Sequence, residues 1–156
     1  PSDGVMSSHW PSTSSECWPR SGAAVIGASD AGAHLDLLAT FNYPTRVLAE
    51  PVRQHGLLSL EEAIHRMTAV QADLYGLVDR GRLHQGAHAD VLLIDEASVA
   101  SDPVTTRPDL PGGAARLYAG ASGIDDVLVA GVPVVEAGAF TNARPGRVLR
   151  SGTDSR

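Results

Sequence analysis

One short segment near the start of the chain combines residue types that could do chemistry. Asp30 follows Ser29, and His34 comes four residues later with Gly32 between them. A carboxylate suits a general base, because it can take a proton from water and return it to a leaving group. Gly32 lets the backbone bend sharply and come close to a ligand. We therefore take Asp30 as the first candidate for a catalytic residue.

The residues before Asp30 predict the element that positions it. Residues 24–28 form a short apolar run that ends abruptly in Ser29-Asp30, which is typical of a buried strand in a parallel sheet. Folds of the α/β class place active-site groups at the carboxyl ends of such strands. Residues 29–42 then form a long connection, and long connections in compact domains are usually binding loops or lids.

Other roles for these side chains stay open. Asp30 beside Gly32 also suits an ordinary turn aspartate. His34 is equally compatible with a substrate contact, a metal ligand and a plain polar loop residue. Ser29 lacks the Gly-x-Ser-x-Gly pattern, so we do not expect a serine nucleophile.

The remaining histidines indicate no metal site. His84 and His88 are spaced for one helix face, but the glycines around them predict turns and strands there. His55 is expected at a helix C-terminus, and His65 on an exposed helix face.

Composition narrows the classes of function. The chain has 156 residues, with 12 basic and 18 acidic side chains and a net charge of −6. This balance argues against a nucleic-acid or anionic-membrane partner. Cys17 is the only cysteine, so neither an internal disulfide nor a cysteine zinc site is expected. With no apolar run long enough for a bilayer and no leader segment, we expect a cytoplasmic protein.

Helical patterns occupy the stretch after the loop. Residues 44–55 predict a helix that Pro51 kinks or divides. Ser59 and Glu62 form a capping box, in which each side chain binds the backbone N–H of the other, before a helix with apolar residues at i, i+3, i+4 and i+7. A second helical stretch covers 70–75.

Strand patterns follow from Gly81 onward. We expect strands at 81–83, 90–95 and 114–119, a loop over 98–113, and a hairpin of 124–130 with 132–136. Residues 1–22 and the tail beyond Phe140 are expected to be irregular.

At this point the chain resembles a known family. The string Val25-Ile26-Gly27-Ala28-Ser29-Asp30-Ala31-Gly32-Ala33-His34 is similar to the last barrel strand of the amidohydrolase superfamily, in its D-aminoacylase or N-acyl-D-amino-acid deacylase branch. Residues 56–63 and 66–68 resemble the helix that follows there. The Gly-x-x-x-x-Gly-x-x-Ala-Asp-Val pattern from Gly81 and the hairpin at 124–138 resemble its accessory β-domain.

The resemblance implies an α/β fold: the C-terminal end of a metal-dependent (β/α)8 (TIM) barrel followed by a small antiparallel β accessory domain. The implied divisions are 1–22 irregular, 23–78 barrel end, 79–143 accessory domain and 144–156 flexible tail. The implied activity is hydrolysis of the linear C–N amide bond of an N-acyl D-amino acid or related amide by water activated on Zn²⁺. Asp30 then carries the proton and binds the metal, and Ser29, Gly32 and His34 contact substrate.

Parts of the family pattern are missing from the chain. It contains no His-x-His to provide metal ligands, although a zinc site needs about three protein ligands. A closed barrel needs roughly 250 residues, and the chain has 156. We therefore expect a C-terminal portion of a deacylase that is inactive alone. Unpaired strand edges would make it marginally stable or lead to a homo-oligomer.

Three alternatives remain at this stage. The parent enzyme could be another amidohydrolase, either a cyclic amidase or a deaminase. The chain could be a non-catalytic interaction module that keeps the barrel-end packing. It could also be an unrelated α/β binding protein, in which case strand 24–28 would be central in a self-contained sheet.

Overall fold

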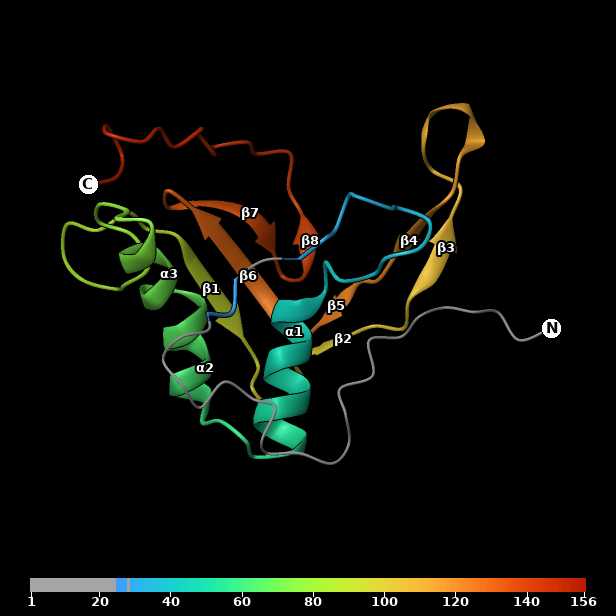
Figure 1. Ribbon diagram of the computed structural model, residues 1–156, viewed down its shortest axis with the longest axis horizontal. Coiled ribbons are helices and arrows are strands. Elements are labelled where there is room, and N and C mark those ends of the chain that lie inside the picture. The colour runs from blue at the N-terminus through green and yellow to red at the C-terminus, as the bar shows by residue number, and fades with distance from the viewer. Residues whose placement is uncertain (1–24, 28) are drawn as a thin grey trace.

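The computed structural model describes residues 25–27 and 29–156, so the predicted irregular segment 1–22 lies outside the described residues. Figure 1 shows the helices grouped beside one four-stranded sheet, with a separate hairpin, β3–β4, projecting away on the other side. No helix in the described ranges is both long and apolar enough to cross a membrane.

The helix predicted over 44–55 is confirmed, and its second half is wider than an α-helix. α1 (Tyr43–Val47) continues directly into the π-helix η1 (Leu48–Gln54), which contains Pro51. Proline has no N–H to donate and crowds the preceding turn, so the helix widens around it. Gly56, with a φ of +57°, follows the helix as the predicted C-terminal stop.

The next helix, α2 (Leu60–Met67), begins with half of the predicted capping box. The Ser59 Oγ accepts a hydrogen bond of 3.2 Å from the Glu62 N–H. The Glu62 carboxylate does not reach back as predicted; it binds Arg66 Nε at 2.5 Å, one turn further along. An i,i+4 ion pair on the helix surface therefore takes the place of the second capping bond.

The helical stretch predicted at 70–75 is confirmed as α3 (Ala69–Leu74), and Gly76 follows with a φ of +62°. The strand predicted at 81–83 is wrong, because these residues form a bend and a loop. The two terminal nitrogens of the Arg82 guanidinium, Nη1 and Nη2, donate to the Asp73 carboxylate at 2.9 and 2.6 Å. This ion pair joins the segment to α3.

The main sheet is antiparallel, with the strand order β1-β6-β7-β8. Its strands are β1 (Val91–Ile94), β6 (Ile124–Val129), β7 (Val132–Glu136) and β8 (Ala139–Phe140). The predicted hairpin is confirmed: Ala130 and Gly131, with φ of +50° and +78°, form a two-residue turn of the kind that matches strand twist.

Two further pairs of short strands lie beside this sheet. β2 (Ala100–Ser101) pairs with β5 (Ala121–Ser122), and β3 (Thr105–Arg107) pairs with β4 (Arg116–Tyr118) around the 3₁₀ turn η2 (Pro111–Gly113). β4 confirms the strand predicted at 114–119. The loop predicted over 98–113 is wrong in part, because β2 and β3 form only through partners later in the chain.

One hydrophobic cluster joins the helices to the strands. Val47, Leu48 and Ala63 from the helices and Val99 from the loop before β2 are buried together. Partly buried side chains from β1 and β6, Ile94 and Ile124, pack against them. Burial of this shared apolar surface holds the helices against the sheet.

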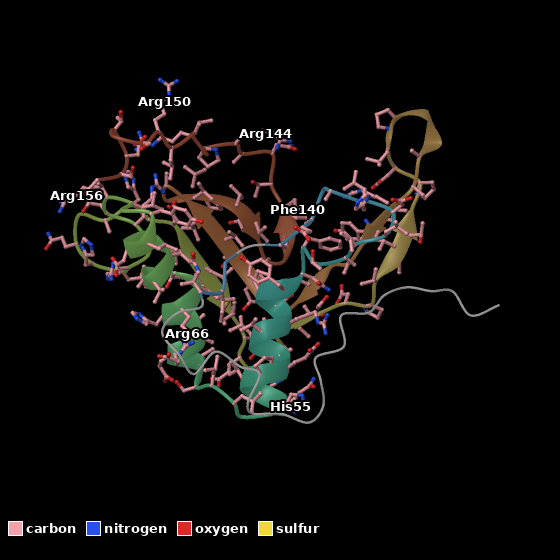
Figure 2. All side chains as sticks on the ribbon, viewed as in Figure 1. His55, Arg66, Phe140, Arg144, Arg150 and Arg156 are labelled. Carbon is pink, nitrogen blue, oxygen red and sulfur yellow. The ribbon has the colours of Figure 1, made fainter. Side chains whose placement is uncertain are left out.

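The end of the chain is more ordered than expected. The Val78 N–H donates to the Asp154 carbonyl at 3.0 Å, and the Arg156 N–H donates to the Gly76 carbonyl at 2.8 Å. In Figure 2 the C-terminal segment runs from Arg144 past Arg150 to Arg156, back toward the helices. The frayed tail predicted beyond Phe140 is therefore wrong for residues 154–156.

Candidate functional site

The strand predicted at 24–28 is not present in the residues that the structure describes. Val25, Ile26 and Gly27 have no strand assignment, and Ala24 and Ala28 lie outside the described residues. A parallel strand is stabilised by hydrogen bonds to strands on both sides, and within the described ranges none of the strands pairs with this segment. A side chain takes that place: the Gln71 amide donates to the Ile26 carbonyl.

The turn after this segment carries the main candidate. Asp30 is exposed, and its backbone carbonyl accepts a hydrogen bond of 3.0 Å from Ala33 N–H. Its carboxylate makes no hydrogen bond to any other described residue. Ser29 also shapes the turn, since its Oγ accepts from the Ala31 N–H at 3.2 Å.

Gly32 and His34 complete the run of turns. Gly32 has a φ of +100°, and no atom of the described residues lies within 4 Å of the place where a side chain would begin. The His34 carbonyl accepts from the N–H groups of Leu37 and Leu38, at 3.1 and 2.9 Å, while its imidazole is exposed. Ser29, Asp30, Gly32 and His34 are thus all exposed, within one run of turns.

Three hydrogen bonds from different elements hold the segment that contains these residues. Gln71 on α3 binds the carbonyl of Ile26 before the turn. The Leu117 N–H on β4 donates to the Leu35 carbonyl at 2.7 Å. At the far end, Asn42 Nδ2 donates to Ser101 Oγ on β2 at 2.7 Å. Figure 1 shows the segment running from the helices to the β3–β4 hairpin and back to α1.

Sequence reasoning missed all three anchoring residues. Gln71, Leu117 and Asn42 lie in unremarkable helical, strand and loop patterns, and their partners are distant in sequence. Only Asn42 has a local sequence signal, because asparagine favours the residue before a helix. That signal predicts a cap on α1, whereas the Asn42 side chain binds Ser101 and does not cap the helix.

The described residues do not by themselves form a metal site. Among them, no group of three or more histidine, cysteine or acidic side chains is placed to hold one ion. His55, His65, His84 and His88 are all exposed, and Figure 2 shows His55 at the end of the η1 helix. Asp30 therefore offers at most one ligand to a metal.

Several carboxylates outside this segment have lowered pKa values. Hydrogen bonds from Arg82 lower the pKa of Asp73, and those from Arg116 lower the pKa of Asp109. The Ser98 hydroxyl, followed by the Ala97 N–H, lowers the pKa of Asp95. Each of these groups fixes a turn or a hairpin, so we assign them structural roles.

Comparisons with known proteins agree on one family. The model of the amidohydrolase family known as Amidohydro_3 matches residues 9–135. An N-acyl-D-glutamate deacylase from Alcaligenes xylosoxydans is 41% identical over 122 residues, which are 78% of this chain and 22% of that enzyme. An N-acyl-D-aspartate deacylase from the same organism is 41% identical over 108 residues, 69% of this chain and 20% of that enzyme.

Solved structures give the same result. A crystal structure of D-aminoacylase superposes with a TM-score of 0.52 at 36% identity, covering 64% of this chain and 19% of that one. A structure from work on the binuclear metal centre of D-aminoacylase gives the same values. The chain spans about a fifth of the length of the curated deacylases that it matches. It belongs to the amidohydrolase family, in the branch of the D-aminoacylases.

Proposed function

We propose that the chain is the C-terminal portion of a metal-dependent N-acyl-D-amino-acid deacylase, which hydrolyses the linear C–N amide bond of its substrate. The observation that carries this proposal is the family match over residues 9–135, which includes the whole run from Ser29 to His34. The deacylase relatives favour this activity over a cyclic amidase, a deaminase or a non-catalytic module.

In this proposal Asp30 is the general base. Its carboxylate is exposed and makes no hydrogen bond to another described residue, while its backbone is held by the turn. Such a group can accept a proton from the attacking water and deliver it to the departing amine nitrogen. Ser29, Gly32 and His34 are proposed to contact the substrate from the same surface.

The metal belongs to the whole enzyme in this proposal. The described residues do not provide a set of metal ligands, so we derive no reaction step from the metal. Zinc is our proposal for its identity, and the binuclear centre of the related D-aminoacylase supports a metal in general. Asp30 is the one ligand that we assign to this chain.

The proposed organisation follows from the order of elements. Residues 23–78 carry the helices and correspond to the barrel end, 79–143 carry the antiparallel strands of the accessory domain, and 144–156 form the tail. The proposed location is the cytoplasm, on the basis of the acidic composition.

A segment replacement tests the activity. The matching part of the N-acyl-D-glutamate deacylase is exchanged for this chain, and hydrolysis of N-acetyl-D-glutamate is measured with zinc present. We expect turnover in the hybrid and none from the 156-residue chain alone. A folded hybrid that binds zinc without hydrolysing any N-acyl D-amino acid would contradict the proposal.

Two aspartates on the same loop provide a matched comparison. Asp30→Asn in the hybrid is expected to lower kcat by about 10²-fold or more, the range typical of a general base. Asp36→Asn, which changes another exposed carboxylate six residues later, should leave kcat unchanged. Equal effects of the two substitutions would show that Asp30 has no special role.

The sheet edges suggest self-association. β1 and β8 are the outer strands of the main sheet, and Leu92 and Leu93 on β1 are 47% and 46% exposed. Edges of this kind tend to pair with other chains, so a homo-oligomer is proposed. Light scattering during size-exclusion chromatography gives the mass directly, and a monomer at high concentration would rule the proposal out.

A further inference from the structure

We propose that Gln71 is a positioning residue for Asp30: its side-chain amide fixes the backbone at Ile26 and Gly27, from which the Asp30 turn departs. The catalytic role of Asp30 rests on the function proposed above. The positioning by Gln71 is a separate property of the chain and can be measured without catalysis.

The Gln71 amide serves two backbone carbonyls at once. Its Nε2 donates to the Ile26 carbonyl and lies 3.5 Å from the carbonyl of Arg66, at the end of α2. The side chain is partly buried between these segments. Because a partly buried carbonyl that loses its donor costs stability, this single amide group stabilises the path of the chain beside the α2–α3 junction.

The Gly27 backbone lies directly against the same amide. A Cβ atom built at Gly27 would come within 2.5 Å of both Cδ and Nε2 of Gln71, so a side chain there would displace the Gln71 amide. Glycine here allows close approach of two segments that are far apart in sequence.

Both partners of this contact are firmly held. Gln71 lies on α3 between Ala69 and Ala72, which are both buried. Ile26 packs against the hydrophobic cluster described above. Asp30 follows Gly27 by three residues, at most about 10 Å of extended chain, so we expect a shift at Gly27 to move the turn that carries Asp30.

The first experiment uses the 156-residue chain. Gln71→Ala removes the amide, and Gln71→Glu keeps its shape but removes the N–H donors. We expect both to lower the heteronuclear ¹⁵N NOE of residues 29–33, which reports picosecond-to-nanosecond motion, while amides within α2 and α3 keep their values. Gln85→Ala, an exposed glutamine in a turn, is the control and should change neither region.

A double-substitution cycle tests the contact itself. Gly27→Ala should lower the heteronuclear NOE of residues 29–33 when Gln71 is present, because the added methyl group displaces its amide. The same substitution should have clearly less effect in the Gln71→Ala background, where no amide is left to displace. Such non-additivity is expected of residues in direct contact. Strictly additive effects, or residues 29–33 that stay rigid in both Gln71 variants, would overturn the proposal.

The hybrid deacylase gives the functional measurement. Gln71→Ala and Gln71→Glu are expected to lower kcat about ten-fold or more with KM little changed, since a misplacement of the order of 1 Å is costly in catalysis. An active hybrid in which both variants keep full kcat would refute the positioning role. If the unsubstituted hybrid is inactive, the proposed function fails instead, and the NMR measurements still decide the role of Gln71.

Discussion

The Asp90 Oδ1 accepts a hydrogen bond of 2.9 Å from the backbone N–H of Ala130, 40 residues later in the chain. Its other carboxylate oxygen pairs with the Arg80 guanidinium. Asp90 therefore connects the start of β1 with the turn between β6 and β7, where Ala130 has a φ of +50°. This contact gives a physical reason for the aspartate in the Gly-x-x-x-x-Gly-x-x-Ala-Asp-Val pattern.

Asp90→Ala is expected to lower the free energy of unfolding by about 1–2 kcal/mol, because the Ala130 N–H loses its acceptor and Arg80 its partner. Urea unfolding followed by circular dichroism measures the change. Asp125→Ala, an exposed aspartate on β6 of the same sheet, should have little effect. Equal losses in the two variants would mean that the Asp90 contacts contribute nothing specific.

Two glycines with similar backbone angles should respond differently to alanine. Gly123 and Gly112 have φ of +65° and +74°, so alanine costs roughly 1–2 kcal/mol at either position. A methyl group at Gly123 would also lie 2.6 Å from the Val99 Cα, whereas at Gly112 it meets open space. We expect Gly123→Ala to destabilise the chain at least twice as much, as measured by thermal unfolding. The reverse order would contradict the packing of β5 and β6 against Val99.

The shared core predicts a second pair of substitutions. Val99 is 1% exposed within the cluster that joins the helices to the sheet, whereas Val148 is 82% exposed. Val99→Ala should cost about 2 kcal/mol of unfolding free energy, through lost burial and a small cavity. Val148→Ala should change it by less than about 0.5 kcal/mol. Chemical denaturation distinguishes these outcomes, and a neutral Val99→Ala would indicate that the helices and sheet do not share one core.

Stability should fall in acid. Asp73, Asp95 and Asp109 have pKa values below their ordinary value of 3.8 because of hydrogen bonds that favour the charged form. These three carboxylates contribute fully to the folding stability when the pH is above 3.8, the ordinary pKa. The contribution is lost as the pH falls through their lower pKa in the folded state. Unfolding measured at a series of pH values below about 5 should show this loss, and Asp95→Asn should make it shallower. A stability that rises on acidification would mean that these carboxylates are not stabilised in the folded chain.

Much of the local structure could be predicted from the sequence, because it depends on residues close together in the chain. Ser59 caps the helix that it precedes, and Ala130-Gly131 forms the two-residue turn that joins β6 to β7. The resemblance of residues 25–34 to the deacylase branch also led to the correct family.

The surroundings of Asp30 were decided by tertiary contacts. An apolar run such as 24–28 becomes a strand only when neighbouring strands provide hydrogen bonds, and in the described structure Ile26 is bound instead by a side chain 45 residues away. Likewise, β2 and β3 form only where β5 and β4 meet them. The sequence by itself determined which residues could do chemistry and which family they belong to. Only the folded chain determined how the segment before Asp30 is anchored, because a hydrogen bond between distant residues leaves no periodic pattern in the sequence.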